Sequence, residues 1–191
     1  MPYTKEHKNQ TRAKILQSAF ELFTDKGFDG VTINDLMKNC SLTRGAFYAH
    51  FPSKSVLYNE SLKFAASSSK LSELKPEQIS NKEWLKQLLD GYLSLEHVNG
   101  IRPCPLAFLA TDVVTQDQEA KETYANVYKG MNKAIFEYVK KFSSCKKEDV
   151  LSVTAMMIGA VAISRTIKDE ETILKLLTSC RLEAGKLLGG I

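Results

Sequence analysis

The sequence predicts an all-α protein, with a small N-terminal helix-turn-helix domain followed by a larger helical domain. Apolar residues recur at three- and four-residue steps through most of the chain, which is the period of an amphipathic helix. Serine, threonine and aspartate, which cap helix starts, precede several of these segments. No segment has the pattern of a β-strand, and there is no internal repeat.

The overall composition is that of an ordinary soluble globular protein. The 191 residues are 43% hydrophobic and 25% charged, enough for one good core or two small ones. No stretch approaches the apolar length of a membrane span, and the polar residues 1–12 do not resemble a secretory signal. We therefore expect a cytoplasmic protein with no membrane partner. The net charge of +4 does not by itself indicate nucleic-acid binding.

The cysteines and histidines are scattered along the chain. They form no C-x-x-C pair and no Cys/His cluster, so we expect no metal site and no cofactor. The sequence offers no nucleophile–base set and no phosphate-binding loop, and we therefore expect no enzymatic activity. The residues concerned are Cys40, Cys104, Cys145, Cys180, His7, His50 and His97.

The first helix is expected over residues 5–26, with Gly27 as its end. Its start belongs to a basic arm, which could lie along a phosphate backbone or be a solvated tail. The basic residues of this arm are Lys5, Lys8, Arg12 and Lys14, against the single acid Glu6.

Two short helices joined by a tight turn are expected between residues 27 and 54. Thr32 and Asp35 match the S/T-x-x-D/E start of the first of them. Its apolar pattern lapses at residues 39–41, where we place the turn.

The second short helix has a side to bury and a side to expose. Thr43 can cap its start, and Phe47 and Phe51, four residues apart, share the buried side. The opposite side carries the small residues Gly45 and Ala49, which would let the backbone approach a groove of DNA closely.

The charges of this region suit a surface that faces phosphates. From Leu36 to Asn59 the chain has no acidic residue, whereas Lys38, Arg44 and Lys54 are basic. An acid on a phosphate-facing surface would oppose binding, so this pattern favours a DNA-reading helix-turn-helix.

Further helices are expected in the rest of the chain. Pro52 and Ser53 mark the start of one that runs to about Ser69, before a polar loop. The others are expected over residues 81–98, after a Ser80 cap, from about 106, over 117–143, from 148 to about 167, and from 169 to about 188. The last two are apolar enough to close a monomer core or to form the interface of a symmetric dimer.

The run from Ile15 to Leu57 resembles the N-terminal domain of the tetracycline-repressor (TetR/AcrR-type) family of transcriptional regulators. The resemblance is carried by an A-x-x-L-F start, a K-G-F turn, the threonine that opens the second helix, and G-x-F-Y-x-H-F-x-S-K. It covers about the first third of the chain. The family usually has glycine in the turn where this chain has Ser41, so Ser41 should be strained or use another turn geometry.

The resemblance implies a helix-turn-helix DNA-binding domain over residues 1–54, with the fourth helix to about 69 as a linker. Residues 55–191 would then form a helical ligand-binding and dimerisation domain. It implies a homodimer through the last two helices, a palindromic operator in double-stranded DNA, and release by a small molecule. Residues matching family positions at the DNA face are Thr32, Arg44, Gly45, Ala46, Tyr48, His50 and Lys54, and Thr43 can add specificity.

An activator, or a helical dimer that does not bind DNA, is the alternative to a repressor. A ligand cavity would be lined by inward aromatic and methionine side chains, for which plain core packing is the commoner role. The candidates are Trp84, Tyr92, Phe108, Tyr128, Met131 and Met156.

Cys104 lies between Pro103 and Pro105, at the start of a short helix. A similar cysteine segment occurs in TetR-type sensors of electrophiles or oxidants, although Pro103 replaces their glycine. The helix start and Arg102 would lower the pKa of the thiol, and modification of Cys104 would then release the operator. The alternative is a small residue that fills the core.

Overall fold

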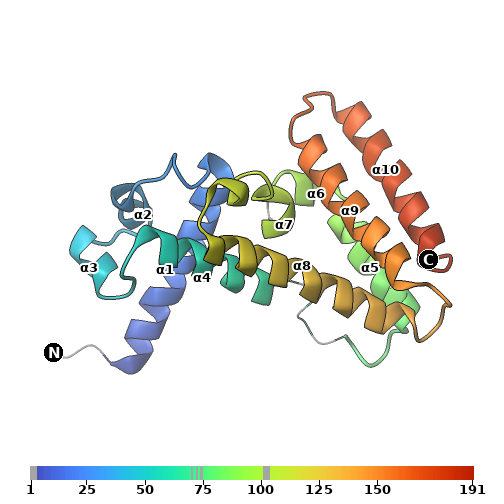
Figure 1. Cartoon of the computed structure of the whole chain (residues 1–191), viewed down its shortest axis with the longest axis horizontal. Coiled ribbons are helices and arrows are strands. Elements are labelled where there is room, and N and C mark those ends of the chain that lie inside the picture. Colours follow the sequence, from blue (N-terminus) through green and yellow to red (C-terminus); the bar gives the residue numbers. More distant parts are fainter. Residues whose placement is uncertain (1–3, 70, 72, 74, 101–103) are drawn as a thin grey trace. The chain divides into compact units, whose positions relative to one another are not determined.

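The computed structural model describes residues 4–69, 71, 73, 75–100 and 104–191. Over these residues the chain is helical and contains no strand, which confirms the all-α prediction (Figure 1). The elements are α1 (Lys5–Lys26), α2 (Ile33–Asn39), α3 (Arg44–Tyr48), α4 (Lys54–Ser67), α5 (Asn81–Tyr92), α6 (Leu95–Val98), α7 (Pro105–Phe108), the 3₁₀ helix η2 (Val113–Thr115), α8 (Gln118–Val139), α9 (Lys147–Ser164) and α10 (Glu170–Leu187).

The chain divides into two compact units. Unit 1 contains residues 1–68 and 109–125, and unit 2 contains residues 69–108 and 126–191. Helix α8 therefore begins in unit 1 and continues in unit 2. The functional division at about residue 54, with a linking fourth helix, stays a prediction.

The ends of α1 and α4 follow from local hydrogen bonds. The Thr4 hydroxyl accepts from the His7 amide at 3.2 Å at the start of α1, and the Gly27 amide donates to the Phe23 carbonyl at 2.9 Å at its end. Gly27 has φ 70°, a conformation that favours glycine. The Ser53 hydroxyl caps α4 by accepting from the Val56 amide at 3.2 Å. These ends agree with the sequence prediction.

The core of unit 1 contains side chains from its N-terminal helices and from residues 109–125. Phe47 of α3 and the following Phe51 are both completely buried, although α3 ends before Phe51. Leu109, Val113 and Ala120, from the second part of the unit, belong to the same cluster of buried side chains. Burying a large apolar side chain contributes roughly 1.5–3 kcal/mol, so this segment is a structural part of unit 1.

In unit 2 the helix predicted over residues 81–98 is broken. Leu93 leaves helical geometry, with φ −92° and ψ 58°, and ends α5. The Ser94 hydroxyl then caps α6, accepting from the His97 amide at 3.2 Å and donating to the Gly91 carbonyl at 2.8 Å. Serine competes for backbone hydrogen bonds in this way, which explains why a continuous helix is not formed.

The long C-terminal helices pack against one another, α9 against α10 (Figure 1). Asp169 caps α10, accepting from the Thr172 amide at 2.9 Å. The predicted ends near residues 143 and 167 were too late, because α8 ends at Val139 and α9 at Ser164.

Candidate nucleic-acid interface

Helix α2 begins with a complete capping box. The Thr32 hydroxyl oxygen accepts from the Asp35 amide at 3.1 Å, and the Asp35 carboxylate accepts from the Thr32 amide at 2.9 Å. The Thr32 hydroxyl also donates to that carboxylate at 2.6 Å. The hydroxyl is the largest cause that lowers the pKa of Asp35. The predicted S/T-x-x-D/E start is confirmed, and it fixes Thr32 on the exposed surface.

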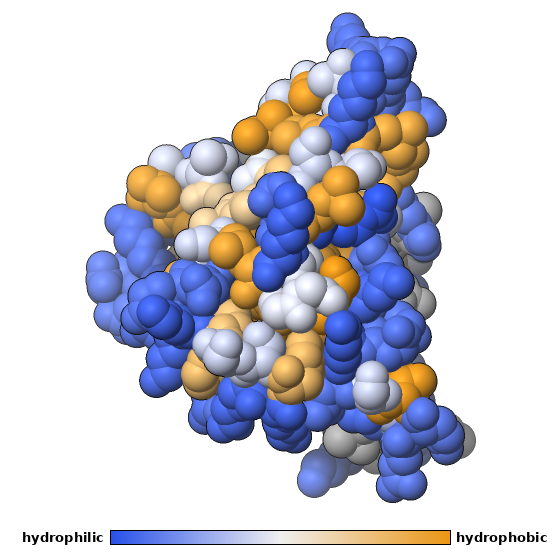
Figure 2. Space-filling model, turned by 90° about the vertical axis from the view of Figure 1, so that its right-hand side faces the viewer, coloured by the Kyte–Doolittle hydropathy of each residue, from blue (hydrophilic) through white to orange (hydrophobic). Residues whose placement is uncertain are grey.

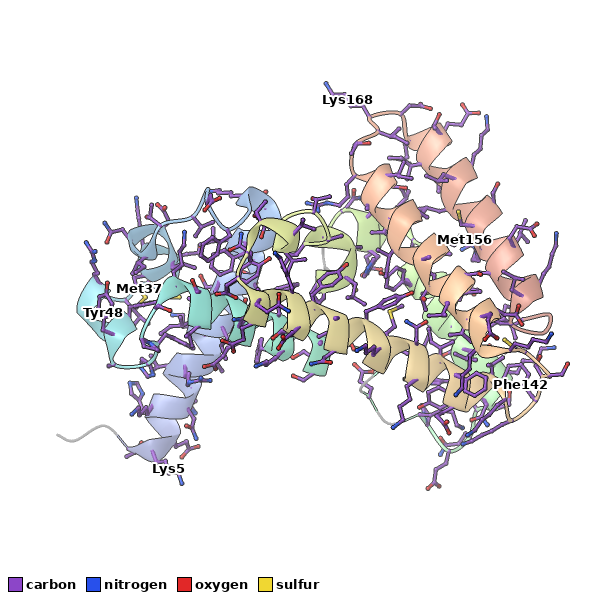
Figure 3. All side chains as sticks on the ribbon, viewed as in Figure 1. Lys5, Met37, Tyr48, Phe142, Met156 and Lys168 are labelled. Carbon is purple, nitrogen blue, oxygen red and sulfur yellow. The ribbon has the colours of Figure 1, made fainter. Side chains whose placement is uncertain are left out.

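Helix α3 has one buried and one exposed side. Phe47 is completely buried, whereas the neighbouring Tyr48 is 55% exposed. Figure 3 marks Tyr48 on α3 and the buried Met37 on α2. The other residues of the predicted DNA face on or beside α3 are exposed, except for the half-buried Ala46: Thr43, Arg44, Gly45 and Ala49.

Thr43 precedes α3 in extended backbone, but its side chain makes no capping hydrogen bond. The Ala46 amide, which a capping hydroxyl would bind, donates instead to the Thr43 main-chain carbonyl at 3.0 Å. The predicted cap is therefore wrong. The Thr43 hydroxyl remains exposed to solvent on the outer face of unit 1.

Gly45 has no internal packing reason to be glycine. A Cβ built on it would meet only the Thr43 hydroxyl oxygen, at 4.0 Å, among the described residues. Gly45 also lies in the helix, where glycine costs about 1 kcal/mol relative to alanine. A close approach by an external partner would account for this residue.

Three of the predicted contact residues meet at one place. An open hollow of about 350 Å³ separates the starts of α2, α3 and α4. Thr32, Arg44 and Lys54 line it, together with Asp29, Val31, Ile33 and Asn34. The helix-turn-helix thus brings two cations and one hydroxyl to the same exposed surface.

Lys54 is held at the edge of this hollow by the protein. Its ammonium donates to the Phe28 carbonyl at 2.9 Å and to the Val31 carbonyl at 3.0 Å. It also lies 4.0 Å from the centroid of the Phe28 ring. Because an ammonium has three N–H donors, one remains for an external acceptor.

His50 and Arg12 lie on the side of α1 and α4. His50 is half-buried, and its pKa is lowered. Burial is the main cause, and the positive charges of Lys8 and Arg12 add to it. Arg12 pairs with Glu60 and lies 4.7 Å from the centroid of the Phe51 ring. Arg12 therefore joins α1 to α4, and does not belong to a solvated basic arm.

Cys104 belongs to an aromatic cluster in unit 2. The Tyr92 hydroxyl forms a hydrogen bond to its thiol. The Tyr92 and His97 ring centroids are 4.5 Å apart, and those of His97 and Phe108 are 6.3 Å apart. The Arg165 guanidinium lies 3.8 Å from the Phe108 centroid.

His97 and Arg165 are not among the residues that the sequence singled out. The break at Leu93 takes His97 out of the helical period of α5, so no spacing rule could place it beside Tyr92. Arg165, just after α9, reaches the cluster from a distant part of the chain, and no local signal indicates that contact.

The low pKa expected for the Cys104 thiol does not hold. Burial raises its pKa, and this outweighs the hydrogen bonds from Tyr92 and from the Leu106 and Ala107 amides. The expected contribution of Arg102 lies outside the described residues.

The other cavity candidates lie wholly or partly in the core. Trp84 and Met131 are 6% and 7% exposed, and Met156 is half-buried. The Tyr128 hydroxyl is 3.3 Å from that of Thr154, which lies 2.8 Å from the Asn132 amide oxygen. Tyr128 thus belongs to a small polar group around a buried threonine.

Two classes of site find no support among the described residues. No group of three His, Cys, Asp or Glu side chains in residues 4–69 and 75–100, or after 103, could hold a metal ion. In the same parts of the chain, no helix has the length and apolar character that crossing a membrane requires. The four cysteines are free thiols.

Comparison with known proteins finds a family match in the helix-turn-helix region. Residues 15–60 match the model of the bacterial regulatory proteins, tetR family. The chain is 25% identical over 123 residues to the uncharacterized HTH-type transcriptional regulator YerO of Bacillus subtilis, covering 62% of this chain and 42% of YerO. It is 40% identical over 50 residues to IcaR of Staphylococcus aureus, a negative transcriptional regulator of the biofilm operon icaADBC, covering 26% of this chain and 27% of IcaR.

A solved structure extends the likeness to the whole fold. The reduced form of NemR from E. coli superposes with a TM-score of 0.80 at 17% identity, covering 93% of this chain and 96% of NemR. At that identity the likeness concerns the fold. The aligned parts span less than half the length of YerO and of IcaR. Residues 15–60 therefore match the model of the tetR family of bacterial regulatory proteins, and nearly the whole chain shares its fold with NemR.

Proposed function

We propose that the protein is a sequence-specific DNA-binding transcriptional regulator that acts as a repressor. The observation that carries the proposal is the exposed face of α3 beside the hollow that Thr32, Arg44 and Lys54 line. Two cations at one surface suit phosphate contacts, and a glycine without an internal role suits close approach to a groove. IcaR, which is similar over 50 residues, is a negative regulator.

The proposal includes a homodimer through α9 and α10. Large apolar side chains on these two helices are exposed in the single chain, and Figure 2, taken from the side of α10, shows apolar side chains gathered between charged ones. A symmetric partner would cover them. They are Leu151, Ile163, Leu174, Leu182 and Leu187.

A dimer would place two copies of α3 in successive major grooves, about 34–36 Å apart, on a palindromic operator. Arg44, Tyr48 and Lys54 would contact phosphates, with Thr32 and His50 beside them. Thr43, Gly45 and Ala46 would face the groove. Ala49 offers only a methyl group, which suits thymine.

The effector is proposed to act through unit 2, as a small molecule or by modification of Cys104. The pKa of the Cys104 thiol bears on the choice between these two routes. Because the thiolate is the reactive form, the raised pKa of this thiol disfavours rapid modification. The raised pKa therefore disfavours the covalent route, and we propose a non-covalent ligand as the effector.

A helical dimer that does not bind DNA is the competing function. That function would not explain the exposed Gly45, nor the lack of acidic residues from Leu36 to Asn59. An activator shares the same interface with a repressor, and the position of the operator relative to a promoter distinguishes them.

The test is selection of bound duplexes from a random pool by the whole protein at moderate salt. We expect a palindrome, and affinity that falls roughly 10³–10⁵-fold between 50 and 200 mM salt if 6–10 phosphates are contacted. Arg44→Ala should weaken binding, whereas Lys168→Ala, which removes an exposed cation from unit 2, should not. No enriched sequence at any salt concentration would refute the proposal.

The same selected duplex separates the two effector routes. A mild thiol-reactive electrophile is added to wild-type protein and to Cys104→Ser. Release of wild type alone would establish the thiol route, and continued binding of both would leave the non-covalent ligand.

A further inference from the structure

One acid of unit 1 is not used by the interface described above. Asp112 precedes η2, at a position where an aspartate side chain commonly caps a helix start. Its side chain makes no capping hydrogen bond to η2. The carboxylate reaches instead to residues that precede it by 54 and 84 positions.

Both carboxylate oxygens of Asp112 are occupied. Oδ1 accepts from the Phe28 amide at 2.9 Å, and Oδ2 accepts from the Tyr58 hydroxyl at 2.7 Å. Tyr58 is 1% exposed, and hydrogen bonds to a carboxylate are stronger than those between neutral groups. Asp112 thus ties the loop after α1 to α4.

The loop is shaped to receive this carboxylate. A Cβ built on Gly27 would lie 2.9 Å from Asp112 Oδ1, so only glycine leaves the oxygen its place. The Phe28 ring also packs against Tyr58, with centroids 5.3 Å apart and the planes at 87°. The acceptor, the loop and the tyrosine therefore form one fixed group.

Phe28 connects this group to Lys54 at the hollow of the proposed DNA-facing surface. The Phe28 amide donates to Asp112, while the carbonyl of the same residue accepts from the Lys54 ammonium at 2.9 Å. The Val31 carbonyl, three residues further along the loop, accepts from the same ammonium at 3.0 Å. Val31 and Lys54 both line the hollow.

We propose that Asp112 is a positioning residue for DNA binding, which fixes the loop after α1 and so holds Lys54 where it meets a phosphate. This inference rests on the proposed function. Asp112 lies six residues before α8, which continues into unit 2. A displacement of residues 109–117 would therefore change the DNA-facing surface through a single carboxylate.

The test compares three variants of the whole protein on the selected duplex. Asp112→Ala removes both hydrogen bonds. Asp112→Asn removes the charge but keeps an oxygen for the Phe28 amide and an amide group for the Tyr58 hydroxyl. Glu119→Gln removes the same charge from an exposed residue at the start of α8, and controls for long-range electrostatics.

The readout is the dissociation constant as a function of salt concentration. For Asp112→Ala we expect roughly tenfold weaker binding near 0.1 M salt. We also expect a log–log slope that is smaller in magnitude by about 2, since each phosphate contact contributes about 0.9 and a dimer would lose two. Asp112→Asn and Glu119→Gln should keep the wild-type slope. A variant that was merely less stable would lose active protein but leave the slope unchanged.

A second measurement does not depend on DNA. Hydrogen exchange of the Phe28 amide should be faster in Asp112→Ala than in wild type, and Tyr58→Phe, which removes one hydroxyl, should lie between them. Wild-type slope and affinity in Asp112→Ala would overturn this inference alone. Wild-type protein that selects no duplex would overturn the proposed function, and this inference with it.

Discussion

The Leu42 amide donates a hydrogen bond of 2.8 Å to the carbonyl of Met37, which closes the turn between α2 and α3. Within it the Ser41 amide donates to the Lys38 carbonyl at 3.0 Å, and Ser41 has φ 57°. This pair of hydrogen bonds is a Schellman motif, which places the residue after the helix cap in left-handed backbone. Glycine is the usual residue there, so Ser41 is strained, which is the first of the two outcomes expected from the family resemblance.

Replacing Ser41 by glycine should therefore stabilise the protein. Left-handed backbone costs a residue with a Cβ about 1–2 kcal/mol, part of which is offset by the greater freedom of glycine in the unfolded chain. We expect Ser41→Gly to raise the free energy of unfolding by about 1 kcal/mol, measured by urea denaturation. Ser41→Ala, which keeps the Cβ, should show no gain. Equal effects of the two substitutions would contradict the strain argument.

The capping box of α2 gives a prediction of the opposite sign. Thr32→Ala removes the hydroxyl that accepts from the Asp35 amide, and N-cap losses of this kind cost about 1 kcal/mol. Thr32→Ser keeps the hydroxyl and should unfold at the wild-type denaturant concentration. The measurement is the urea concentration at the midpoint of unfolding of each variant. A wild-type midpoint for Thr32→Ala would show that the cap contributes nothing to stability.

Such local features are what the sequence could predict. The ends of α1, α2 and α4 depend on side chains within four residues of the bonds they make, so Thr32, Gly27 and Ser53 could be read from spacing alone. The outward face of α3 could also be read from the spacing of Phe47 and Phe51, and the resemblance over residues 15–57 added the glycine position that Ser41 occupies.

The remaining features depend on residues far apart in the chain or on competing local hydrogen bonds. Asp112 meets Phe28 across 84 residues, and nothing near Asp112 distinguishes it from an ordinary helix cap. The break at Leu93 depends on a competing hydrogen bond of Ser94. The Thr43 side chain does not cap α3, because the Ala46 amide donates to the Thr43 main-chain carbonyl. In each case a contact with a distant residue or a competing hydrogen bond replaced the alternative that the local sequence favours.

The apolar surface of α9 and α10 predicts the effect of a charge placed there. Leu182 is 61% exposed in the single chain and would be covered in the proposed dimer. Leu182→Glu would bury an unpaired carboxylate in each copy, and we expect a dimer dissociation constant at least about a hundredfold weaker. Analytical ultracentrifugation measures this. Val114→Glu, at a residue 65% exposed in unit 1, is the matched control and should remain dimeric.

The half-buried His97 predicts how stability depends on pH. Burial lowers its pKa to about 4, and its Nε2 atom has no hydrogen-bond partner among the described residues. In the unfolded chain the pKa returns to about 6.5, so the unfolded state binds the proton first as the pH falls. The stabilisation from neutral His97 is complete above about pH 6.5 and is lost between there and about pH 4.

Replacing His97 by phenylalanine should remove this acid-sensitive contribution. A phenyl ring can keep the contacts with Tyr92 and Phe108 but cannot bind a proton. Between pH 7 and pH 4.5 the free energy of unfolding of wild type should fall by about 2.5 kcal/mol more than that of His97→Phe. His7→Phe, at an exposed histidine of α1, should keep the wild-type pH dependence. Parallel pH profiles for wild type and His97→Phe would mean that the folded protein protonates His97 as easily as the unfolded chain does, with solvent reaching its ring.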